Sequence, residues 1–333
     1  MKTVLKLLGA LLALAVIGVA ALLVTCSLTW PPRFPETPLP DIRATDDPAV
    51  VARGRYIVHA LAHCSACHAP MDAYLASKPG DEVTPIGGRE WKMGPLGTIR
   101  ASNLTPHPTT GIGDYSDAEL ARAIRHGVKR NGEPALFMYV TGASSDEDLT
   151  AVVSYLRSLP PVDNAVAPHE IGLLGRVLFQ GPMGFFAAPH DYSAFAPTFV
   201  REGAASLERG RYLAEGPAAC AGCHSDFTYD GALAFTGQLL SGNAATPIPD
   251  ETDPSFEFYA PNLTPDPETG HITAWTQEQF TARMRGGRVH VGSPMPWESY
   301  ANLTDADVES IWLYLRSLPP TVKRVGEIRR PAE

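Results

Sequence analysis

Apolar residues recur at the spacing of a helix in short segments of this chain of 333 residues. Positions i, i+3, i+4 and i+7 are apolar in two such segments: Leu149, Val152, Val153 and Leu156, and later Val308, Ile311, Trp312 and Leu315. This spacing is typical of a helix that packs on one side. No segment shows the sustained alternation of apolar and polar residues that marks a half-buried strand. The pattern therefore predicts an all-α fold.

Residues that cap helices precede these apolar segments. Asp47 is followed by Pro48, which suits the first position of a helix. A capping signature, with a polar residue followed three positions later by an acidic residue or glutamine, predicts four more helix starts. These are Ser116 with Glu119, Thr276 with Gln279, Ser145 with Asp148, and Thr304 with Asp307.

The chain repeats itself. The segment YLRSLPP occurs at 155–161 and again at 314–320, and Asn-Leu-Thr-Pro occurs at 103–106 and at 262–265. A repeat of this length predicts two copies of one structural unit. We divide the chain into a membrane anchor or signal (1–30), a Pro-rich spacer (31–46), a first domain (47–161), an aromatic-rich connector (162–205), a second domain (206–322) and a C-terminal tail (323–333).

The N-terminus carries an apolar run from Leu7 to Val24 after Lys2 and Lys6. A run of this length is at the lower limit for a membrane span, and the lysines place its start in the cytoplasm. An uncleaved anchor is favoured, because a cleaved signal has a shorter apolar region and a small-residue exit. Lipidation of Cys26 is a further alternative. All of these place the bulk of the chain outside the cytoplasm.

The connector contains five phenylalanines among glycine and proline: Phe179, Phe185, Phe186, Phe195 and Phe199. A free linker is more polar than this. We expect the connector to pack against the two domains and to help form their interface. A surface for a membrane or a partner protein is the alternative.

Two copies of C-x-x-C-H give the chain its chemistry. Cys64, Cys67 and His68 form the first, and Cys220, Cys223 and His224 form the second. The pattern indicates covalent haem c, because two thiols can bond the vinyl groups of one porphyrin while the histidine ligates the iron. Zinc ribbons pair such units over about 15–20 residues, and thioredoxin-type pairs need a βαβ context. Zinc and redox cysteine therefore stay as weaker alternatives, and the sequence predicts two covalently bound haem c groups.

A haem iron that only carries electrons needs a second axial ligand. Met295 lies between two prolines, which stiffen its loop. Met138 occupies the same point in the first half, between the second and the last helix. We predict that His68 and Met138 ligate one iron and that His224 and Met295 ligate the other. His107 and His126 are the alternatives to Met138.

The motifs taken together resemble a known family. The order GRY, CxxCH, GG, GTI, NLTP, TGIG, a methionine loop and YLRSLPP is similar to the membrane-anchored multihaem cytochrome c subunits of bacterial alcohol, aldehyde and gluconate dehydrogenase complexes. The resemblance implies class I cytochrome c domains in tandem, a place on the periplasmic side of the bacterial inner membrane, and a dehydrogenase catalytic subunit as electron donor. It implies quinone, an oxidase or another cytochrome as acceptor.

These features favour an electron carrier with no catalysis of its own. The net charge of −9 argues against nucleic acid as a partner. The alternative is a dihaem cytochrome c peroxidase, which would need one iron with an open position and an acid–base group such as Glu133 near the first methionine loop.

Overall fold

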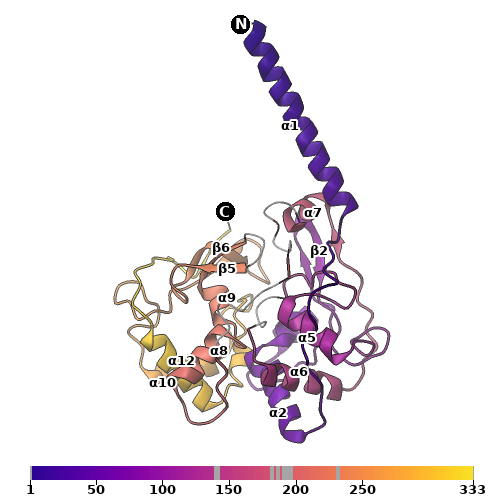
Figure 1. Ribbon diagram of the computed structural model, residues 1–333. Coiled ribbons are helices and arrows are strands. Elements are labelled where there is room, and N and C mark those ends of the chain that lie inside the picture. The colour runs from indigo at the N-terminus through magenta and orange to yellow at the C-terminus, as the bar shows by residue number, and fades with distance from the viewer. Residues whose placement is uncertain are drawn as a thin grey trace.

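The computed structural model consists of two lobes and one long helix that projects from the first lobe (Figure 1). It describes residues 2–138, 143–180, 184, 188–189, 198–229 and 233–332. Phe185, Phe186 and Phe195 of the connector lie outside this part of the chain. The projecting helix is α1 (Lys2–Leu28), and it is apolar and long enough to cross a membrane. One such helix near the N-terminus is also what a signal sequence provides.

The remaining helices are short and are divided between the lobes. In the first part of the chain they are α2 (Pro48–Tyr56), the π-helical turn η1 (Ile57–Leu61), α3 (Cys64–His68), α4 (Met71–Ala76), the 3₁₀ turn η2 (Gly94–Leu96), α5 (Asp117–His126), α6 (Asp146–Ser158) and α7 (Leu173–Gln180). In the second part they are α8 (Leu207–Glu215), α9 (Cys220–His224), α10 (Gln277–Arg285), α11 (Trp297–Tyr300) and α12 (Asp305–Ser317).

The prediction of an all-α fold was wrong, because the described chain also forms three small antiparallel sheets. Their strands are β1 (Glu90–Lys92), β2 (Gly97–Arg100), β3 (Glu170–Ile171), β4 (Asp226–Tyr229), β5 (Leu233–Thr236), β6 (Asn243–Pro249), β7 (Phe256–Ala260) and β8 (Arg329–Pro331). The orders are β1-β2-β3, β4-β5 and β6-β7-β8. Most of these strands are too short to show an alternating pattern. Two of them, β3 and β8, find their partners far away in the sequence, which no local pattern reports.

The predicted helix starts are confirmed. Asp47 Oδ1 accepts hydrogen bonds from two amides of α2, and complete capping boxes start α5 and α10. At α6 and α12 only half of each box forms. Ser145 and Thr304 accept from the amides of Asp148 and Asp307, but both carboxylates are used for other contacts.

Each lobe is built on one close helix pair. Helix α2 crosses α6, and α8 crosses α12, at a glycine of the repeated Gly-Arg-Tyr segment. A Cβ on Gly54 would overlap the carbonyl of Ala151, and one on Gly210 would overlap the carbonyl of Ser310. Glycine at this position therefore lets the two backbones touch.

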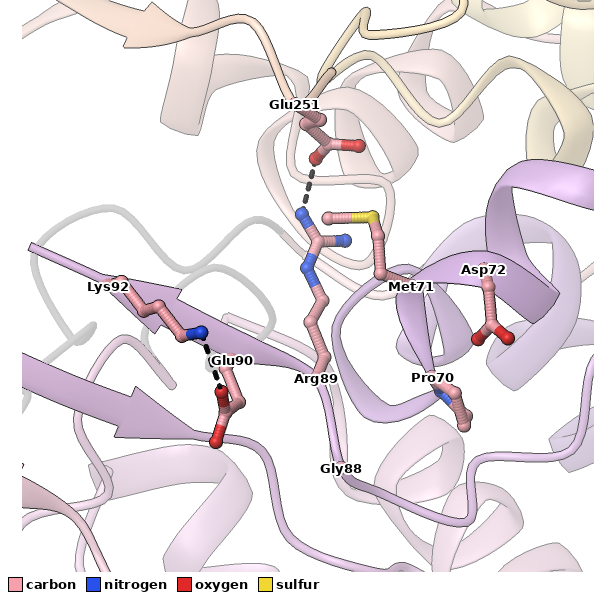
Figure 2. A pocket seen from close by; sticks show the side chains of 8 residues that line it. All are labelled: Pro70, Met71, Asp72, Gly88, Arg89, Glu90, Lys92 and Glu251. Carbon is pink, nitrogen blue, oxygen red and sulfur yellow. Dashed lines mark hydrogen bonds and ion pairs between the residues drawn. The ribbon is translucent and has the colours of Figure 1, made fainter. Parts of the chain in front are cut away.

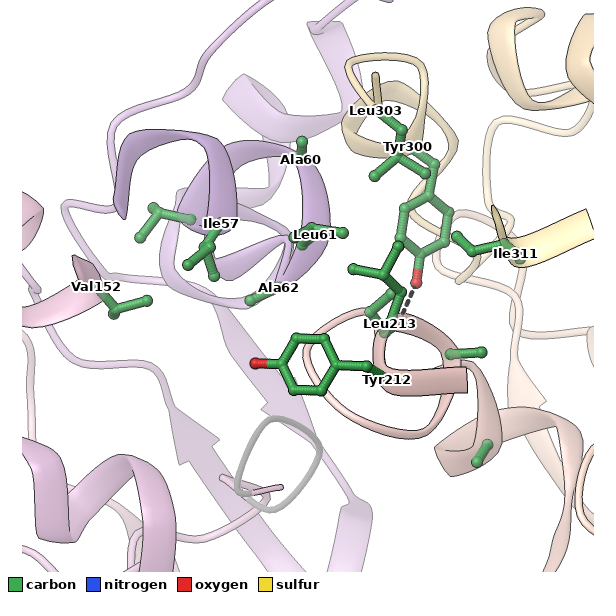
Figure 3. Close-up of a cluster of buried hydrophobic side chains, with 14 of the residues drawn as sticks. Ile57, Ala60, Leu61, Ala62, Val152, Tyr212, Leu213, Tyr300, Leu303 and Ile311 are labelled. Atoms are coloured by element: carbon green, nitrogen blue, oxygen red, sulfur yellow. Dashed lines mark hydrogen bonds between the residues drawn. The ribbon is translucent and has the colours of Figure 1, made fainter. Parts of the chain in front are cut away.

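One apolar core runs through both lobes. Leu61 of η1 faces Leu213 of α8 and Tyr300 of α11, while Ile57 lies on the side of η1 toward Val152 of α6 (Figure 3). Leu61 and Leu213 are fully buried. Because this core is shared, the two lobes are held together by the hydrophobic effect as well as by polar contacts.

The described parts of the connector pack against the lobes, as predicted. Asn164 Nδ2 donates to the carbonyl of Ile86 at 2.7 Å, and β3 pairs with β2. The ring of Phe199 meets that of Tyr212 edge to face, with centroids 5.4 Å apart. The contact between the lobes, however, is made mainly by η1, α8 and α11 and by the ends of α2, α6 and α12.

Candidate functional site: two histidines held alike

Both cysteine motifs form a single helical turn after a residue with left-handed backbone. His63 precedes α3 with φ 40° and Ala219 precedes α9 with φ 53°. In each turn the two cysteines are three residues apart and so lie on one side of the helix. Cys67 and Cys223 are exposed while Cys64 and Cys220 are partly buried, and all four are free thiols. The arrangement suits two thioether bonds to one flat group.

The two motif histidines are held in the same way. His68 Nδ1 lies 2.8 Å from the carbonyl oxygen of Ser102, and His224 Nδ1 lies 2.9 Å from that of Pro261. A carbonyl only accepts, so Nδ1 carries the proton and Nε2 keeps its lone pair. This is how proteins orient a histidine that binds a metal. Burial keeps both rings neutral by lowering the pKa of His68 and that of His224, the latter to about 4.

The repeated Asn-Leu-Thr-Pro segment explains why these carbonyls are in place. Asn103 directly follows Ser102, and Asn262 directly follows Pro261. Each asparagine accepts from the amide two residues on at 2.9 Å and donates through Nδ2, at 2.8 Å, to the chain just beyond YLRSLPP. Both asparagines are buried. Through these bonds the Asn-Leu-Thr-Pro segment holds the loop that bears the histidine-binding carbonyl. The loop is held against the chain just after α6 in the first lobe and just after α12 in the second.

The surroundings of the thiols are not those of reactive redox cysteines. Burial raises the pKa of Cys64 and of Cys220 to about 12. Reactive redox cysteines have a lowered thiol pKa. Within the described residues, moreover, no group of three or more His, Cys, Asp or Glu side chains could hold a metal ion. The residues present therefore fit a covalently attached haem c better than a zinc or disulfide site.

The two motifs lie near each other at the contact between the lobes. The Tyr300 hydroxyl donates to the carbonyl of Ala218 at 2.6 Å, next to the second motif. The same ring meets His63 edge to face, with centroids 5.6 Å apart, next to the first motif. The Cys67 thiol of the first lobe also contributes to the raised pKa of Cys223. One buried tyrosine therefore joins the two sites.

The predicted methionine ligands are both half-buried. Met295 packs against the shared core, and its carbonyl accepts from the Trp297 amide at 2.8 Å. Met138 closes a turn with its amide 3.0 Å from the Ala135 carbonyl, and residues 139–142 of its loop lie outside the described chain. Ligation by these two sulfur atoms stays a prediction.

His107 and His126, the alternatives to Met138, lie in different surroundings from the two motif histidines. The amide and the hydroxyl of Thr110 lie 3.2 Å and 2.8 Å from His107 Nδ1, so this ring helps to hold its own loop. His126 is half-buried at the end of α5. Glu133, considered above as an acid–base group, lies 3.7 Å from Lys129 Nζ and 3.5 Å from Arg33 Nη2. An ion-paired carboxylate is poorly suited to proton transfer at an open iron.

Comparison with known proteins agrees with the geometry. No protein-family model matches the chain. The alcohol dehydrogenase (quinone) cytochrome c subunit of Gluconacetobacter polyoxogenes is 30% identical over 301 residues, which cover 84% of this chain and 58% of that protein. The gluconate 2-dehydrogenase cytochrome c subunit of Pantoea cypripedii is 33% identical over 299 residues, covering 84% and 62%. A diheme cytochrome c-type protein of Cereibacter sphaeroides is 28% identical over 264 residues, covering 77% and 82%.

The chain is a homologue of these cytochrome c subunits. It spans about three fifths of the length of the two dehydrogenase subunits. The similarity extends over most of the chain, so it includes more than the short cysteine motifs.

Sequence reasoning missed a pair of crossed contacts at the boundary between the lobes of this cytochrome homologue. The Arg53 guanidinium binds both carboxylate oxygens of Asp148 at 2.9 Å, and the Tyr212 hydroxyl of the other lobe donates to that carboxylate at 2.6 Å. Arg209 binds Asp307 at 2.8 and 3.0 Å, and Tyr56 donates to Asp307 at 2.7 Å. The recurring Arg-x-x-Tyr spacing was the available signal.

A second group of charges joins the lobes beside the first motif. Figure 2 shows Arg89, directly before β1, reaching to Glu251 of the second lobe, at the edge of a pocket of about 550 Å³. Arg89 also donates to the carbonyl of Ala66, inside the first C-x-x-C-H turn. Nearby, Arg288 stacks over the Tyr74 ring, with its central carbon 4.5 Å from the ring centroid. These contacts link the position of the first motif to the second lobe.

Proposed function

We propose that this protein is a dihaem c-type cytochrome that transfers electrons for a dehydrogenase and has no catalysis of its own. The observation that carries the proposal is the identical orientation of His68 and His224, each behind a pair of free cysteines. The relatives named as cytochrome c subunits support it.

The roles of the residues follow from their chemistry. Cys64 and Cys67 would attach one haem c, and Cys220 and Cys223 the other. The bound haem supplies an iron that changes oxidation state by one electron. The protein's part would be to hold each haem through its cysteines, with His68 and Met138 as ligands of one iron and His224 and Met295 as ligands of the other. With both positions filled, neither iron would offer a place to a substrate.

The shared core bears on how electrons move within the chain. Because Tyr300 contacts the neighbourhood of both motifs and is 3% exposed, the two lobes form one packed unit around them. We therefore propose that residues 47–161 and 206–322 are two haem domains fixed in mutual position. Electrons would enter one haem and leave from the other without a docking step in between.

The partners follow from the relatives and from α1. We propose a dehydrogenase catalytic subunit as donor, since two of the relatives are subunits of such enzymes. Quinone, an oxidase or another cytochrome would be the acceptor. Helix α1 would anchor the chain in the bacterial inner membrane, with both lobes on the periplasmic side.

The peroxidase alternative is not favoured. The relatives named above are cytochrome subunits, and the acid–base candidate Glu133 is held by two cations.

The visible spectrum of the purified oxidised protein tests the proposal. We expect two haems per chain and a weak far-red band, from methionine sulfur bound to ferric iron, with the intensity of two such bonds. Rapid turnover of peroxide with a reduced donor, together with a band for one bond or none, would contradict the carrier function and support a peroxidase.

A further inference from the structure

Helix α7 lies at the base of α1, on the side of the first lobe from which α1 projects (Figure 1). Its eight residues present two unlike faces. Gly175 and Phe179 are buried against the lobe, whereas Leu173 and Leu174 are 47% and 54% exposed. We expect an exposed pair of leucines on a short, otherwise well-packed helix to contact an apolar partner.

The buried face of α7 is fastened to the lobe. The Gly172 amide, just before the helix, donates to the carbonyl of Leu96 at 3.0 Å. A Cβ on Gly175 would overlap the same carbonyl, so the α7 backbone lies directly on η2. Because the backbones are in contact, α7 cannot roll to bury Leu173 and Leu174 without losing this packing.

The end of α7 is also tied to α1. Gln180 Nε2 donates to the carbonyl of Cys26, and Cys26 is 4% exposed although the rest of α1 lies largely open. The rings of Trp30 and Phe179 lie 6.2 Å apart, directly after α1. The apolar surface of α7 therefore adjoins the end of a helix that is apolar on all sides.

We propose that α7 lies in the boundary between headgroups and acyl chains of the membrane that α1 spans, with Leu173 and Leu174 inserted. This inference rests on the anchoring by α1 proposed above. The occupant is lipid, because α7 packs against the end of α1, the helix proposed to span the membrane, and Leu28 in the last turn of α1 is 80% exposed like the leucines of α7. Arg176 is the one charged residue of α7; its Nε donates to the Ile171 carbonyl at 3.1 Å, and its guanidinium is the kind of group that binds phosphate at this depth. Two contacts, α1 and α7, would fix the tilt of the first lobe against the membrane.

Photochemical crosslinking of the full-length holoprotein tests this surface. A benzophenone amino acid replaces Leu174, and the protein is placed in nanodiscs of phosphatidylethanolamine and phosphatidylglycerol, illuminated and weighed by mass spectrometry. Val16 of α1, which is 61% exposed, is the positive control. Ala52, an exposed residue of α2 at the far end of the first lobe, is the matched negative control (Figure 1). An unchanged visible spectrum shows that each variant has folded around its haems.

We expect phospholipid adducts from positions 174 and 16, and a several-fold lower yield at 52. A lipid yield at 174 as low as that at 52, with position 16 still reacting, would overturn the inference for α7 and leave the anchor standing. An adduct at 174 with a protein chain instead of lipid would overturn it as well. Failure at position 16 would refute the membrane anchor, and the inference for α7 with it.

Discussion

The two lobes hold their motif histidines identically but surround them differently. The tyrosine that opens each YLRSLPP segment reaches back to the helix before the cysteine motif. In the first lobe Tyr155 lies 2.8 Å from Nε2 of the buried His59. In the second lobe Tyr314 donates to the buried Glu215, whose carboxylate also lies 3.2 Å from Arg211. The helix before the motif is thus neutral at this point in one lobe and ionic in the other.

The loops that carry Met138 and Met295 also differ between the lobes. Met295 is fixed by Pro294 and Pro296 and packs on the core, whereas the loop of Met138 has no proline beside the methionine. The backbone contacts that orient the motif histidines therefore recur in both lobes, whereas the side chains on the helices before the motifs differ. With a haem in each lobe, as proposed, such differences would give the two irons different potentials and give electron flow a direction.

The largest expected effect is the loss of one haem from one lobe. Replacing both cysteines of a motif, as in Cys220→Ala with Cys223→Ala, removes both attachment points. Pyridine haemochrome assays should then give one haem per chain in place of two, and the Cys64→Ala, Cys67→Ala variant should give the same number. Cys26→Ala is the control and should keep two. Loss of both haems from either variant would show that the lobes do not assemble independently.

The methionine loops give the next effect. Met295→Ala should lower the potential of one haem by on the order of 100 mV, a part of the ~0.8 V range that axial ligands cover, because it removes a ligand that favours ferrous iron. Met138→Ala should lower the other potential. The far-red absorption should fall by half in each variant. Redox titration of both proteins measures the shifts. Equal shifts of both haems in one variant would contradict separate ligand sets.

Tyr56 and Tyr212 each bind a carboxylate of the opposite lobe, and replacing them tests whether both contacts contribute equally to stability. Tyr56→Phe and Tyr212→Phe each remove a hydrogen bond to a carboxylate, and each should reduce the free energy of unfolding by about 1.5 kcal/mol. Denaturant titration of the holoprotein, followed by tyrosine and haem signals, measures the loss. A loss in one variant alone would show that a single crossed contact holds the lobes together.

The smallest effect is a difference in acid sensitivity. Burial lowers the pKa of His59 below its usual value of 6.5. The unfolded chain therefore binds this proton more readily than the folded one, and the folded state loses stability as the pH falls below about 6.5, by at most ~1.4 kcal/mol per pH unit. The His59→Gln variant should show a shallower decline between pH 6.5 and 5 in thermal unfolding. An identical decline would mean that His59 is already charged in the folded protein.

Local features of the chain were readable from the sequence because they depend on neighbouring residues. The helix caps at Asp47, Ser116 and Thr276 satisfy amides within one turn, and the cysteine motifs place their thiols and histidine within five residues. The repeat of Asn-Leu-Thr-Pro was visible too, although its purpose was not, since the atoms that Asn103 and Asn262 bind lie 59 residues away.

The sequence by itself determined two cysteine motifs, their histidines, most helices and an apolar N-terminal run. Only the tertiary structure decided that the chain is mixed rather than all-α, because most strands are too short to show an alternating pattern and β3 and β8 exist through partners that are distant in the sequence. It also decided that Asp148 and Asp307 complete the opposite lobe's tyrosine contacts rather than their own capping boxes. A carboxylate near a helix start satisfies whichever donor the fold brings closest, and that choice depends on packing between lobes, which no local pattern contains.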